Sequence, residues 1–537
     1  MTEKLALLWP EIILFLGTCV VMLLGLSPSA ELRRITGVVA GVSIGLAGII
    51  ASLTPTVATP LLPEMMPYAK GLIAIIGLLL LLLSAGTVDR AEENAIAAGR
   101  RRYDPLRSTR GEFYAFFLFS MTGLMLCASA DDLIWLFLAL ELTSLPTYVM
   151  VTISTRGTRS QEAGVKYFFL GALGAAIFLY GFALLYGGAG TTNLTEMHAY
   201  FAANGLNPIA TAGIVLSILG IAFKIAAVPM HFYTADVYQG AAAPVGAFLA
   251  FVPKTAGFLA LLAILAAVGW THGLDGSSLP PEVRVVLWIL AALTMTVGNT
   301  LALLQTSIKR VLAYSSIAHS GYMIVGLIAG PGNGSFTQNG LAAVLFYLLT
   351  YGVMNIGAFA VVACLEHDRG ETTEPDEADH IDDLKGLCKT KPVLGWVIVI
   401  SSLGLLGLPP LLGFFGKVPL FTSGIAAGEI PLVLVLAVNS AIAAFYYLRF
   451  VNNALLADPD PRGEKLRETP LPARRVAAVV ATGGVIVLTA AAGGLIPAAE
   501  KAGTYAPMTA AQAQDYLEAA GRPPFVEREA QSAGLGQ

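Results

Sequence analysis

The stretch FKIAAVPMHFYTADVYQGAAAPVGAFLAFVPKTAG, residues Phe223 to Gly257, decides the fold. It places Lys224 and Lys254 inside otherwise apolar helical sequence, with Pro229 between them. A charged side chain near the centre of a bilayer costs roughly 2.5–3.5 kcal/mol on insertion scales, so it usually has a function. Proline breaks a helix, and broken backbone is tolerated at membrane depth only where protein or a watery cavity covers it. The stretch therefore predicts a broken membrane helix beside an ion or proton path.

The composition indicates a protein that crosses the membrane many times. Of the 537 residues, 56% are hydrophobic and 13% charged, and the mean hydropathy is +0.71. Soluble domains carry about 25% charged residues. The formal net charge of -4 argues against a nucleic-acid partner. The first apolar stretch, up to Leu26, lacks a basic n-region, so we expect a membrane span rather than a cleaved signal peptide.

The sequence contains no pattern for a cofactor or a metal. Cys19, Cys127, Cys364 and Cys388 lie far apart without a C-x-x-C motif, which gives no iron–sulfur, haem or zinc site. A Gly-rich nucleotide loop and a P-loop are also absent from the sequence. We therefore expect any redox or ATP chemistry to take place in a partner.

Apolar runs long enough to cross about 30 Å of hydrocarbon recur along the whole chain. They predict an all-α polytopic membrane protein with about fourteen transmembrane helices, of which the seventh and twelfth are broken. The expected spans are 5–28, 35–54, 70–87, 112–129, 132–153, 162–187, 208–238, 243–269, 284–305, 310–330, 338–364, 393–424, 430–453 and 475–498.

Every second connection between these spans is basic, except the short neutral connection 239–242, and the connections between the basic ones hold almost no lysine or arginine. The positive-inside rule then places the basic connections in the cytoplasm and both termini on the outer side, which requires an even number of spans. The basic residues are Arg33, Arg34, Arg90, Arg100, Arg101, Arg102, Arg107, Arg110, Arg156, Arg159, Lys309, Arg310, Lys385, Lys389, Lys391, Arg462, Lys465, Arg467, Arg474 and Arg475.

The two broken spans suggest an internal repeat. Lys224 precedes Pro229 in the seventh span, and Pro409 and Pro410 precede Lys417 in the twelfth. The seventh and twelfth spans lie five spans apart. Because five is an odd number, two five-span units that each contain one broken span cross the membrane in opposite orientations, as in inverted repeats built on discontinuous helices. The predicted organisation is 1–111 (three helices and a basic loop), 112–269 (first repeat), 284–453 (second repeat), 475–498 (last helix) and 499–537 (tail).

Glu141 lies in the middle of the fifth expected span and is the candidate partner of a buried lysine. Burial lowers the pKa of lysines in general and a nearby carboxylate raises it, so a small movement of either group switches a lysine between charged and neutral. The candidate lysines are Lys224, Lys254 and Lys417. The alternatives are a hydrogen bond from Glu141 to Ser or Thr of a neighbouring helix, and lysines that snorkel to the interface.

His319 belongs to a polar stripe in the tenth span. Ser315, His319 and Tyr322 recur at i, i+4 and i+7, which places them on one helix face. The stripe is a candidate for a water wire, and a packing histidine is the alternative.

Other polar residues have simpler interpretations. Asp131 and Asp132 open the fifth span and are expected to pair with its helix dipole. His231 and Asp236 follow the break, where they either take part in the site or satisfy freed backbone groups. The connection 365–392 lacks a calcium-loop spacing and is expected to be a solvated surface loop.

Several of these stretches resemble one membrane-protein family. Residues 223–254 are similar to the signature of the antiporter-like subunits of respiratory complex I. Four further stretches are similar to the subunit N group of the bacterial NADH–quinone oxidoreductases, and the resemblance covers roughly residues 1–500. The stretches are EFYAFFLFSMTGLMLCASADDLIWLFLALELTSLPTYV, EAGVKYFFLGALGAAIFLYGFALLYG, SIKRVLAYSSIAHSGYMIVG and LPPLLGFFGK.

The resemblance implies fourteen helices, with helices four to eight and nine to thirteen as inverted repeats. The key charges of the family fall on Glu141 in the fifth helix, Lys224 in the seventh, Lys254 in the eighth and Lys417 in the twelfth. His319 falls on the central polar axis of the family. These five residues are the expected proton path.

The implied function is that of a proton-translocating membrane-arm subunit of a NADH:quinone oxidoreductase in the bacterial inner membrane. FMN, iron–sulfur clusters and quinone are expected in partner subunits, and none of them in this chain. The expected partners are other membrane-arm subunits, including a neighbouring antiporter-like subunit and small helical subunits, and lipids. Two alternatives remain: a subunit of a cation/proton antiporter or membrane-bound hydrogenase, and a non-conducting structural spacer.

Overall fold

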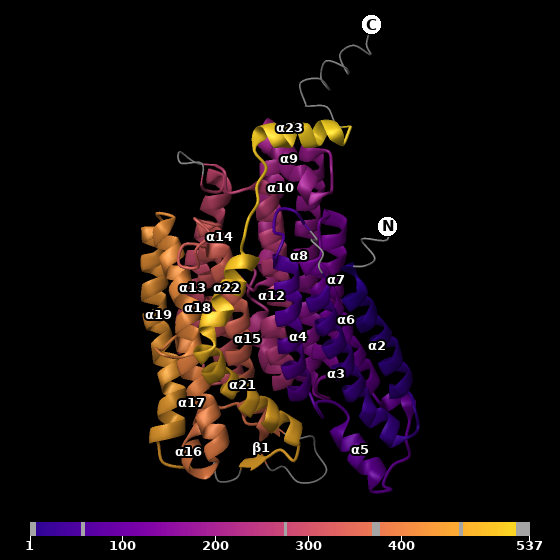
Figure 1. Cartoon of the computed structure of the whole chain (residues 1–537). Helices are drawn as coiled ribbons and strands as arrows, with labels where there is room; N and C mark the ends of the chain where they lie inside the picture. Colours follow the sequence, from indigo (N-terminus) through magenta and orange to yellow (C-terminus); the bar gives the residue numbers. More distant parts are fainter. Residues whose placement is uncertain (1–6, 55–58, 273–276, 368–375, 461–465, 522–537) are drawn as a thin grey trace.

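The computed structural model describes residues 7–54, 59–272, 277–367, 376–460 and 466–521. Both chain ends, for which the sequence predicts an outer position, lie outside these residues. The described part of the chain is mostly helical and forms an elongated bundle (Figure 1).

Eleven helices of the described residues are long and apolar enough to cross a membrane, and four shorter apolar helices accompany them. The all-α polytopic fold is therefore confirmed, while the number of membrane crossings stays a prediction. The long helices are α3 (Ala30–Leu53), α4 (Met65–Leu83), α6 (Arg110–Ala128), α7 (Leu133–Ile153), α8 (Thr158–Ala189), α12 (Ala243–Val268), α13 (Pro281–Leu303), α14 (Ile308–Ala329), α15 (Gly340–Cys364), α19 (Ile430–Val451) and α21 (Pro472–Ala490). The shorter ones are α2 (Trp9–Gly25), α10 (Pro208–Lys224), α17 (Pro392–Leu406) and α18 (Leu412–Ala426).

Two helices are broken where the sequence predicts breaks. α10 ends at Lys224, and nine residues separate it from the short α11 (Thr234–Gly240). α17 ends at Leu406 and α18 begins at Leu412, with two prolines between them. Proline has no N–H to donate, so the chain leaves helical geometry at both places. Each break brings free backbone groups into the bundle, where they need partners.

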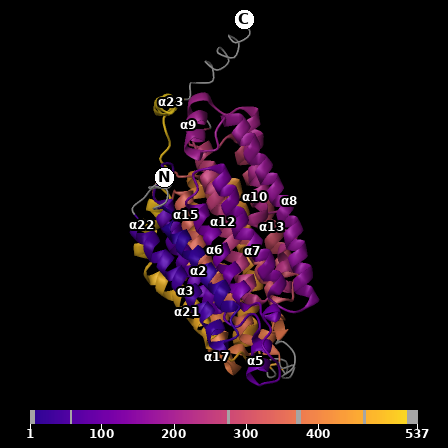
Figure 2. The same cartoon turned by 90° about the vertical axis from the view of Figure 1, so that its right-hand side faces the viewer.

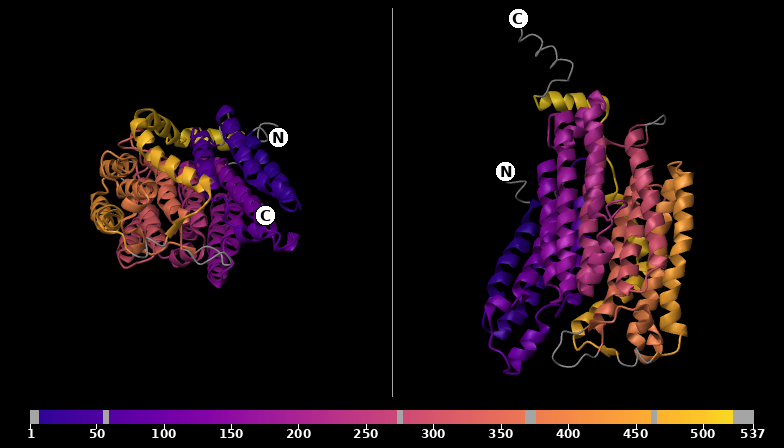
Figure 3. Two further views of the ribbon diagram at one scale, coloured as in Figure 1. Left: turned by 90° about the horizontal axis from the view of Figure 1, so that it is seen from below. Right: turned by 180° about the vertical axis from the view of Figure 1, so that it is seen from behind.

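Three helices form the core of the bundle. Every residue of α12 and α15 is buried, and α14 is buried over nearly its whole length. Helices that are apolar on all sides are typical of such positions. The first half of the chain, indigo to magenta, lies on one side of this core, and the orange second half lies on the other (Figure 1 and Figure 3). Side chains on the core helices are therefore shielded from lipid.

One end of the bundle carries the basic connections, and we call it the basic end. Arg90, Arg159, Lys309 and Arg474, which belong to four different connections of the predicted topology, line one cavity there, and the last three lie in the first turns of α8, α14 and α21. This arrangement agrees with the predicted alternation of basic connections. The small elements at this end are α5 (Arg90–Ala97), β1 (Leu365–His367), β2 (Asp376–Glu377), α16 (Leu387–Thr390), β3 (Leu466–Glu468), two 3-10 turns (Pro105–Arg107 and Ile381–Leu384) and a π-helical turn (Asn452–Leu456).

The connection 365–392 is more than the expected solvated loop. β1 pairs antiparallel with β2 on one side and with β3 on the other. Glu377 accepts a hydrogen bond of 2.8 Å from the N–H of Ala243, the first residue of α12, and pairs with Lys309 at 3.0 Å. The first N–H groups of a helix lack intrahelical partners and attract a carboxylate, which sequence periodicity does not reveal. The prediction was wrong for 376–392, and residues 368–375 lie outside the described chain.

A C-terminal strap, which we define as residues 503–519, crosses the opposite end. α21 is followed by α22 (Ala492–Ala502) and, after an extended segment, by α23 (Ala510–Ala519). α23 packs on α9 (Leu194–Asn204) of the first half, as two views show (Figure 1 and Figure 2). Part of the predicted tail is therefore folded against the bundle.

Candidate functional site

Lys224 is the last residue of α10, at the edge of the first break. Its ammonium donates to Oε1 of Glu141 at 2.9 Å and to Oγ of Ser144 at 2.5 Å. Glu141 and Ser144 are three residues apart on α7, so they lie on one helix face. The Lys224 side chain is 1% exposed, which excludes snorkelling, whereas Glu141 is 18% exposed. The structure thus brings the expected glutamate and lysine into one ion pair.

Hydroxyl groups of neighbouring helices satisfy the backbone at this break. The N–H of Val228 donates to Oγ1 of Thr294 on α13 at 2.9 Å. Ser320 on α14 donates its hydroxyl proton to the carbonyl of Ile225 at 2.5 Å. The break is therefore held by the second half of the chain, and it touches the helix that carries His319.

The two polar residues after the break have different surroundings, and His231 is hydrogen-bonded to the backbone of Pro229. Asp236 pairs with Lys166 at 3.1 Å and with Arg310 at 2.8 Å. The Nδ1 atom of His231 is buried without a hydrogen-bond partner among the described residues. Asp236 thus binds side chains of α8 and α14 at the basic end and does not reach the freed backbone.

Lys254 lies in the fully buried helix α12. Its ammonium donates to the carbonyl and, at 2.6 Å, to the hydroxyl of Ser316 on α14. It also lies 4.9 Å from the ring centre of Tyr351 on α15. No carboxylate of the described residues forms an ion pair with it. Lys254 therefore differs from Lys224 in that only uncharged groups hold it.

His319 on α14 is held by two tyrosines. Its Nδ1 lies 2.6 Å from the hydroxyl of Tyr347, and its Nε2 lies 2.9 Å from the hydroxyl of Tyr447. Neutral imidazole has one donor and one acceptor nitrogen, so one phenol accepts and the other donates. Ser315 joins this group through Tyr447, whereas Tyr322 accepts from Asn299 at 2.9 Å. Two residues of the predicted stripe, Ser315 and His319, thus belong to one hydrogen-bonded cluster, and the water wire stays a prediction.

Lys417 on α18 lies at the second break. Its ammonium donates to the carbonyl of Leu406, the last residue of α17, at 2.8 Å. The last carbonyls of a helix are free and carry partial negative charge, so they stabilise a cation. The ring centre of Tyr322 lies 5.1 Å from the same ammonium. With only 5% of its surface exposed, Lys417 does not snorkel.

These contacts join the five expected residues into one sequence of neighbours, which we call the polar row. Ser320 provides the step between the first break and Lys254, because its hydroxyl also lies 3.3 Å from the carbonyl of Ser316. Aromatic contacts provide the steps beyond Lys254, where Tyr351 and Tyr322 each lie against the ring of His319. The polar row runs through Glu141, Lys224, Ser320, Ser316, Lys254, Tyr351, His319, Tyr322 and Lys417.

The sequence analysis missed a second buried ion pair. Lys70 on α4 lies 2.7 Å from Glu11 on α2, with exposed side-chain fractions of 0% and 4%. Ser129 at the end of α6 donates to the same carboxylate at 3.1 Å. The rule that found Glu141, a charge inside an apolar run, applies to both residues. The serines and tyrosines of the polar row were also missed, because their types are common in membrane helices.

Other expectations concern caps and metals. Asp132 accepts a hydrogen bond of 2.8 Å from the N–H of Ile134 at the start of α7, as expected for a helix N-terminus. Asp131 accepts from Thr195 at 2.8 Å. No group of three or more His, Cys, Asp or Glu in the described chain is placed to hold a metal ion.

Comparison with known proteins decides the family. The model of the family "NADH:quinone oxidoreductase/Mrp antiporter, TM" matches residues 130–443. NADH-quinone oxidoreductase subunit N of Myxococcus xanthus is 40% identical over 413 residues, which cover 72% of this chain and 76% of the relative. The chain belongs to the subunit N family of NADH-quinone oxidoreductases. The resemblance that the sequence motifs indicate is therefore confirmed.

Further members and solved structures agree with this assignment. Subunit N of Trichlorobacter lovleyi is 43% identical over 343 residues, covering 64% of this chain and 66% of the relative. A chain of respiratory complex I from Thermus thermophilus with bound aureothin superposes with a TM-score of 0.71 at 32% identity, covering 91% of this chain and 98% of that chain. The Mrp complex from Dietzia gives a TM-score of 0.72 at 20% identity, covering 96% of this chain and 99% of that chain, which shows a shared fold alone.

Proposed function

We propose that this chain conducts protons across the membrane as a membrane-arm subunit of complex I. The observation that carries the proposal is the polar row, in which a Glu141–Lys224 ion pair continues through hydroxyl, imidazole and phenol groups to Lys417. Ionisable residues inside membrane proteins are rare and typically mark proton relays. Each group of the row exchanges a proton or lies against one that does.

Lys224 is the central carrier in this proposal, and Glu141 sets its protonation. A buried ammonium is stable when a carboxylate pairs with it, and it becomes costly when the carboxylate moves away or is protonated. Glu141 is partly exposed on the outside of the bundle, so a neighbouring subunit is able to act on it. Loss of the pair then releases a proton from Lys224 into the polar row.

Lys254 and His319 relay the proton, and Lys417 is the terminal group toward the outer side. Lys254 is held by the carbonyl and hydroxyl oxygens of Ser316, and Lys417 by the carbonyl oxygen of Leu406; these oxygens accept from an ammonium but do not neutralise it. Both sites therefore hold a proton less firmly than a site with a carboxylate. The two repeats, 112–269 and 284–453, contribute one broken helix each to this path.

The remaining parts of the proposal concern the assembly. Redox chemistry with FMN, iron–sulfur clusters and quinone takes place in partner subunits, and its energy drives the protons through this chain. The partners are other membrane-arm subunits, including a neighbouring antiporter-like subunit and small helical subunits, together with lipids. The basic end faces the cytoplasm of a bacterial cell, and both termini lie on the outer side of its inner membrane.

The test is proton pumping by the intact complex with Glu141→Gln, which keeps the size of the side chain and removes its charge. The proposal predicts fewer protons pumped per NADH oxidised while electron transfer to quinone continues. An unchanged pumping ratio in the assembled complex contradicts it and favours the structural spacer. Cation/proton exchange without NADH favours the antiporter alternative.

A further inference from the structure

The connection between α4 and α6 is a folded part of the basic end, and we call its residues 90–107 the α5 segment. Arg33 on α3 holds it, because its buried guanidinium donates to both carboxylate oxygens of Glu93 on α5, at 2.7 and 3.0 Å. The ring centre of Tyr103 lies 4.0 Å from the same guanidinium, and the Tyr103 hydroxyl donates to the carbonyl of Gly25 at the end of α2. The α5 segment is therefore attached to α2 and α3 (Figure 1).

A tight turn after α5 precedes a run of arginines. α5 ends at Ala97, and Gly99 has a φ of +68°, a conformation that glycine commonly adopts just past the end of a helix. The N–H groups of Arg100 and Arg101 both donate to the carbonyl of Ala95, at 2.9 and 3.3 Å. The three consecutive arginines that follow the turn therefore start from a fixed backbone.

Three exposed arginines at this place form no ion pair with any residue of the described chain: Arg34, Arg100 and Arg102. Arg34 directly follows Arg33, and Arg102 directly precedes Tyr103, so both lie where the α5 segment meets α3. Their positive charge is therefore open to a group from outside the described chain.

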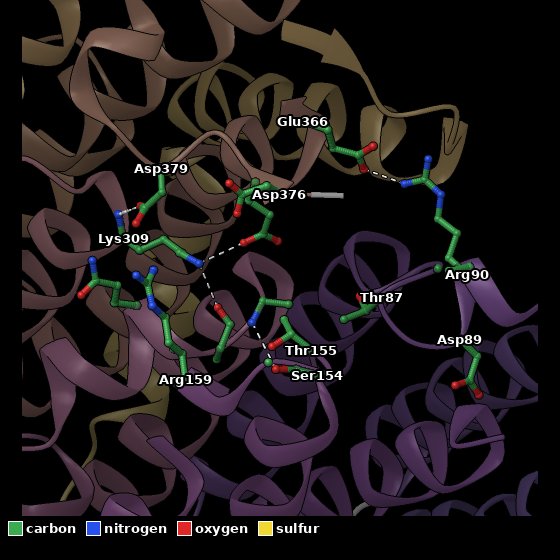
Figure 4. A pocket seen from close by; sticks show the side chains of 18 of the residues that line it. Thr87, Asp89, Arg90, Ser154, Thr155, Arg159, Lys309, Glu366, Asp376 and Asp379 are labelled. Carbon is green, nitrogen blue, oxygen red and sulfur yellow. Dashed lines mark hydrogen bonds and ion pairs between the residues drawn. The ribbon is translucent and has the colours of Figure 1, made fainter. Parts of the chain in front are cut away.

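Other cations of the basic end are bound within the chain. Arg90, the first residue of α5, pairs with Glu366 at 2.6 Å beside the cavity of the basic end (Figure 4). Lys309 pairs with Glu377 at 3.0 Å in the wall of the same cavity. The unpaired arginines thus lie past the other end of α5, away from the carboxylates that neutralise these two cations.

An exposed apolar stripe leads from Arg34 along α3. Val38, Val42 and Ile49 follow Arg34 by four, eight and fifteen residues, which places them on the same helix face. Each of the three side chains is more than half exposed. From residue 35 to residue 53 the helix rises about 28 Å, close to the thickness of the hydrocarbon core of a bilayer. Arg34 therefore lies at the level where hydrocarbon meets lipid headgroups.

We propose that the α5 segment and this stripe form a binding site for an anionic phospholipid. Its phosphate groups bind Arg34, Arg100 and Arg102, because a guanidinium donates to phosphate oxygens in pairs. Its acyl chain lies along the stripe on α3. A free phosphate ion fits less well, because it leaves the stripe uncovered. The site does not depend on proton conduction, so it goes beyond the proposed function.

The test is photo-cross-linking in the intact complex, reconstituted in vesicles of phosphatidylethanolamine with a minor share of phosphatidylglycerol. An amino acid that carries benzophenone replaces Ala98, which is exposed and lies two residues before Arg100. Each arginine near an anionic surface favours an anionic lipid about fivefold. We therefore expect phosphatidylglycerol to be enriched at least about fivefold in the cross-linked lipid over its share of the vesicle. Cross-linked lipid with the composition of the vesicle, or a cross-link to another subunit in place of lipid, overturns the site.

Leu304 provides the matched control position. It is exposed at the end of α13 that lies at the basic end. The nearby Lys309 and Arg310 are both ion-paired within the chain. Benzophenone at this position is therefore expected to cross-link lipid in the proportions of the vesicle. Equal enrichment of phosphatidylglycerol at both positions overturns the site.

Removal of the charges completes the test. The triple variant Arg34→Gln, Arg100→Gln and Arg102→Gln is expected to lower the enrichment at residue 98 to the level at residue 304. If this variant does not assemble, high salt replaces it, because salt screens exposed charges and is expected to lower the enrichment in the native complex. An enrichment that survives the triple variant, or high salt in its place, overturns the site.

Discussion

Two buried ion pairs of the same chemistry lie in different parts of this molecule. Glu141 and Lys224 are 2.9 Å apart between α7 and α10, and Glu11 and Lys70 are 2.7 Å apart between α2 and α4. Both lysines are almost completely buried. Lys224 ends a broken helix, whereas Lys70 lies inside a continuous one.

The difference shows what a buried pair needs in order to act as a carrier. The carbonyl after Lys224 binds Ser320, which leads on to Lys254, so a proton that leaves the pair has somewhere to go. The Glu11 pair binds only Ser129 and the backbone of Leu7 among the described residues. We infer that the Glu11–Lys70 pair fastens the first three helices, and that the break and the polar row make Glu141–Lys224 functional.

The largest expected effect is a loss of stability when the Glu11–Lys70 pair, which is not part of the polar row, is broken. Lys70→Met leaves Glu11 as an unpaired buried charge, which costs about 3–5 kcal/mol. We expect much less assembled complex, measured as its abundance and its thermal unfolding temperature in the membrane. The double variant Glu11→Gln with Lys70→Met removes both charges and is expected to recover most of the loss. Equal abundance of the single and double variants contradicts the fastening role.

A smaller effect is expected at the second break, where Gly407 faces Lys417. Gly407 has a φ of +85°, and a Cβ there would lie 2.9 Å from Cδ of Lys417. Gly407→Ala therefore adds about 1–2 kcal/mol of backbone strain and also displaces the lysine. Proton pumping is expected to fall although Lys417 is still present.

Gly99 provides the matched control for this substitution. It has a φ of +68°, and a Cβ added there would have no neighbour within 4 Å. Gly99→Ala carries the same kind of strain, and we expect it to leave pumping per NADH unchanged. If both alanine variants pump alike, the position of Lys417 does not matter for conduction.

The smallest effect concerns His198, which holds the C-terminal strap. Its Nε2 accepts from the N–H of Met508 at 3.0 Å, and its Nδ1 lies 3.2 Å from the carbonyl of Ala267, so the ring is neutral with its proton on Nδ1. Burial lowers the pKa of His198, and the Ala267 carbonyl opposes this. The contribution to stability is complete above the ordinary value of about 6.5 and is lost as the pH falls through the folded value.

We therefore expect that an acidic pH on the side of the membrane where the strap lies weakens the attachment of residues 503–519 to the bundle. The number of protons pumped per NADH is expected to stay the same. The measurement is hydrogen exchange of the Met508 amide between neutral and acidic pH. His198→Gln keeps an acceptor for that N–H and does not titrate, so its pH profile is expected to be flat. A native profile as flat as that of His198→Gln contradicts the assignment.

Single residues in the sequence predicted much of the fold and of the site. Charges and prolines inside apolar runs are costly in a bilayer, so Glu141, Lys224 and both breaks are visible without a structure. The groups that bind the lysines cannot be found from the sequence, because periodicity shows which face of a helix a residue lies on but not which helix packs against that face. Ser316 for Lys254 and the Leu406 carbonyl for Lys417 are such cases.

The elements at the two ends of the bundle escaped prediction for a different reason. The sheet of β1, β2 and β3 joins strands of two or three residues from connections far apart in sequence, which leave no alternating pattern. The strap packs on α9 through a small apolar cluster of three residues, Ala199, Ala513 and Leu517. Glu11 and Lys70 also lie inside apolar runs, but within the first two turns of α2 and α4, where snorkelling is the usual explanation for a charge.

The central claim is that continuity with the polar row, and not a buried ion pair as such, makes a lysine a proton carrier. The most direct test compares protons pumped per NADH in assembled complexes that carry Lys224→Met or Lys70→Met. We predict that Lys224→Met loses the protons conducted by this chain, and that the assembled fraction of Lys70→Met keeps the full ratio. A full ratio in Lys224→Met, or equal losses in both variants, contradicts the account.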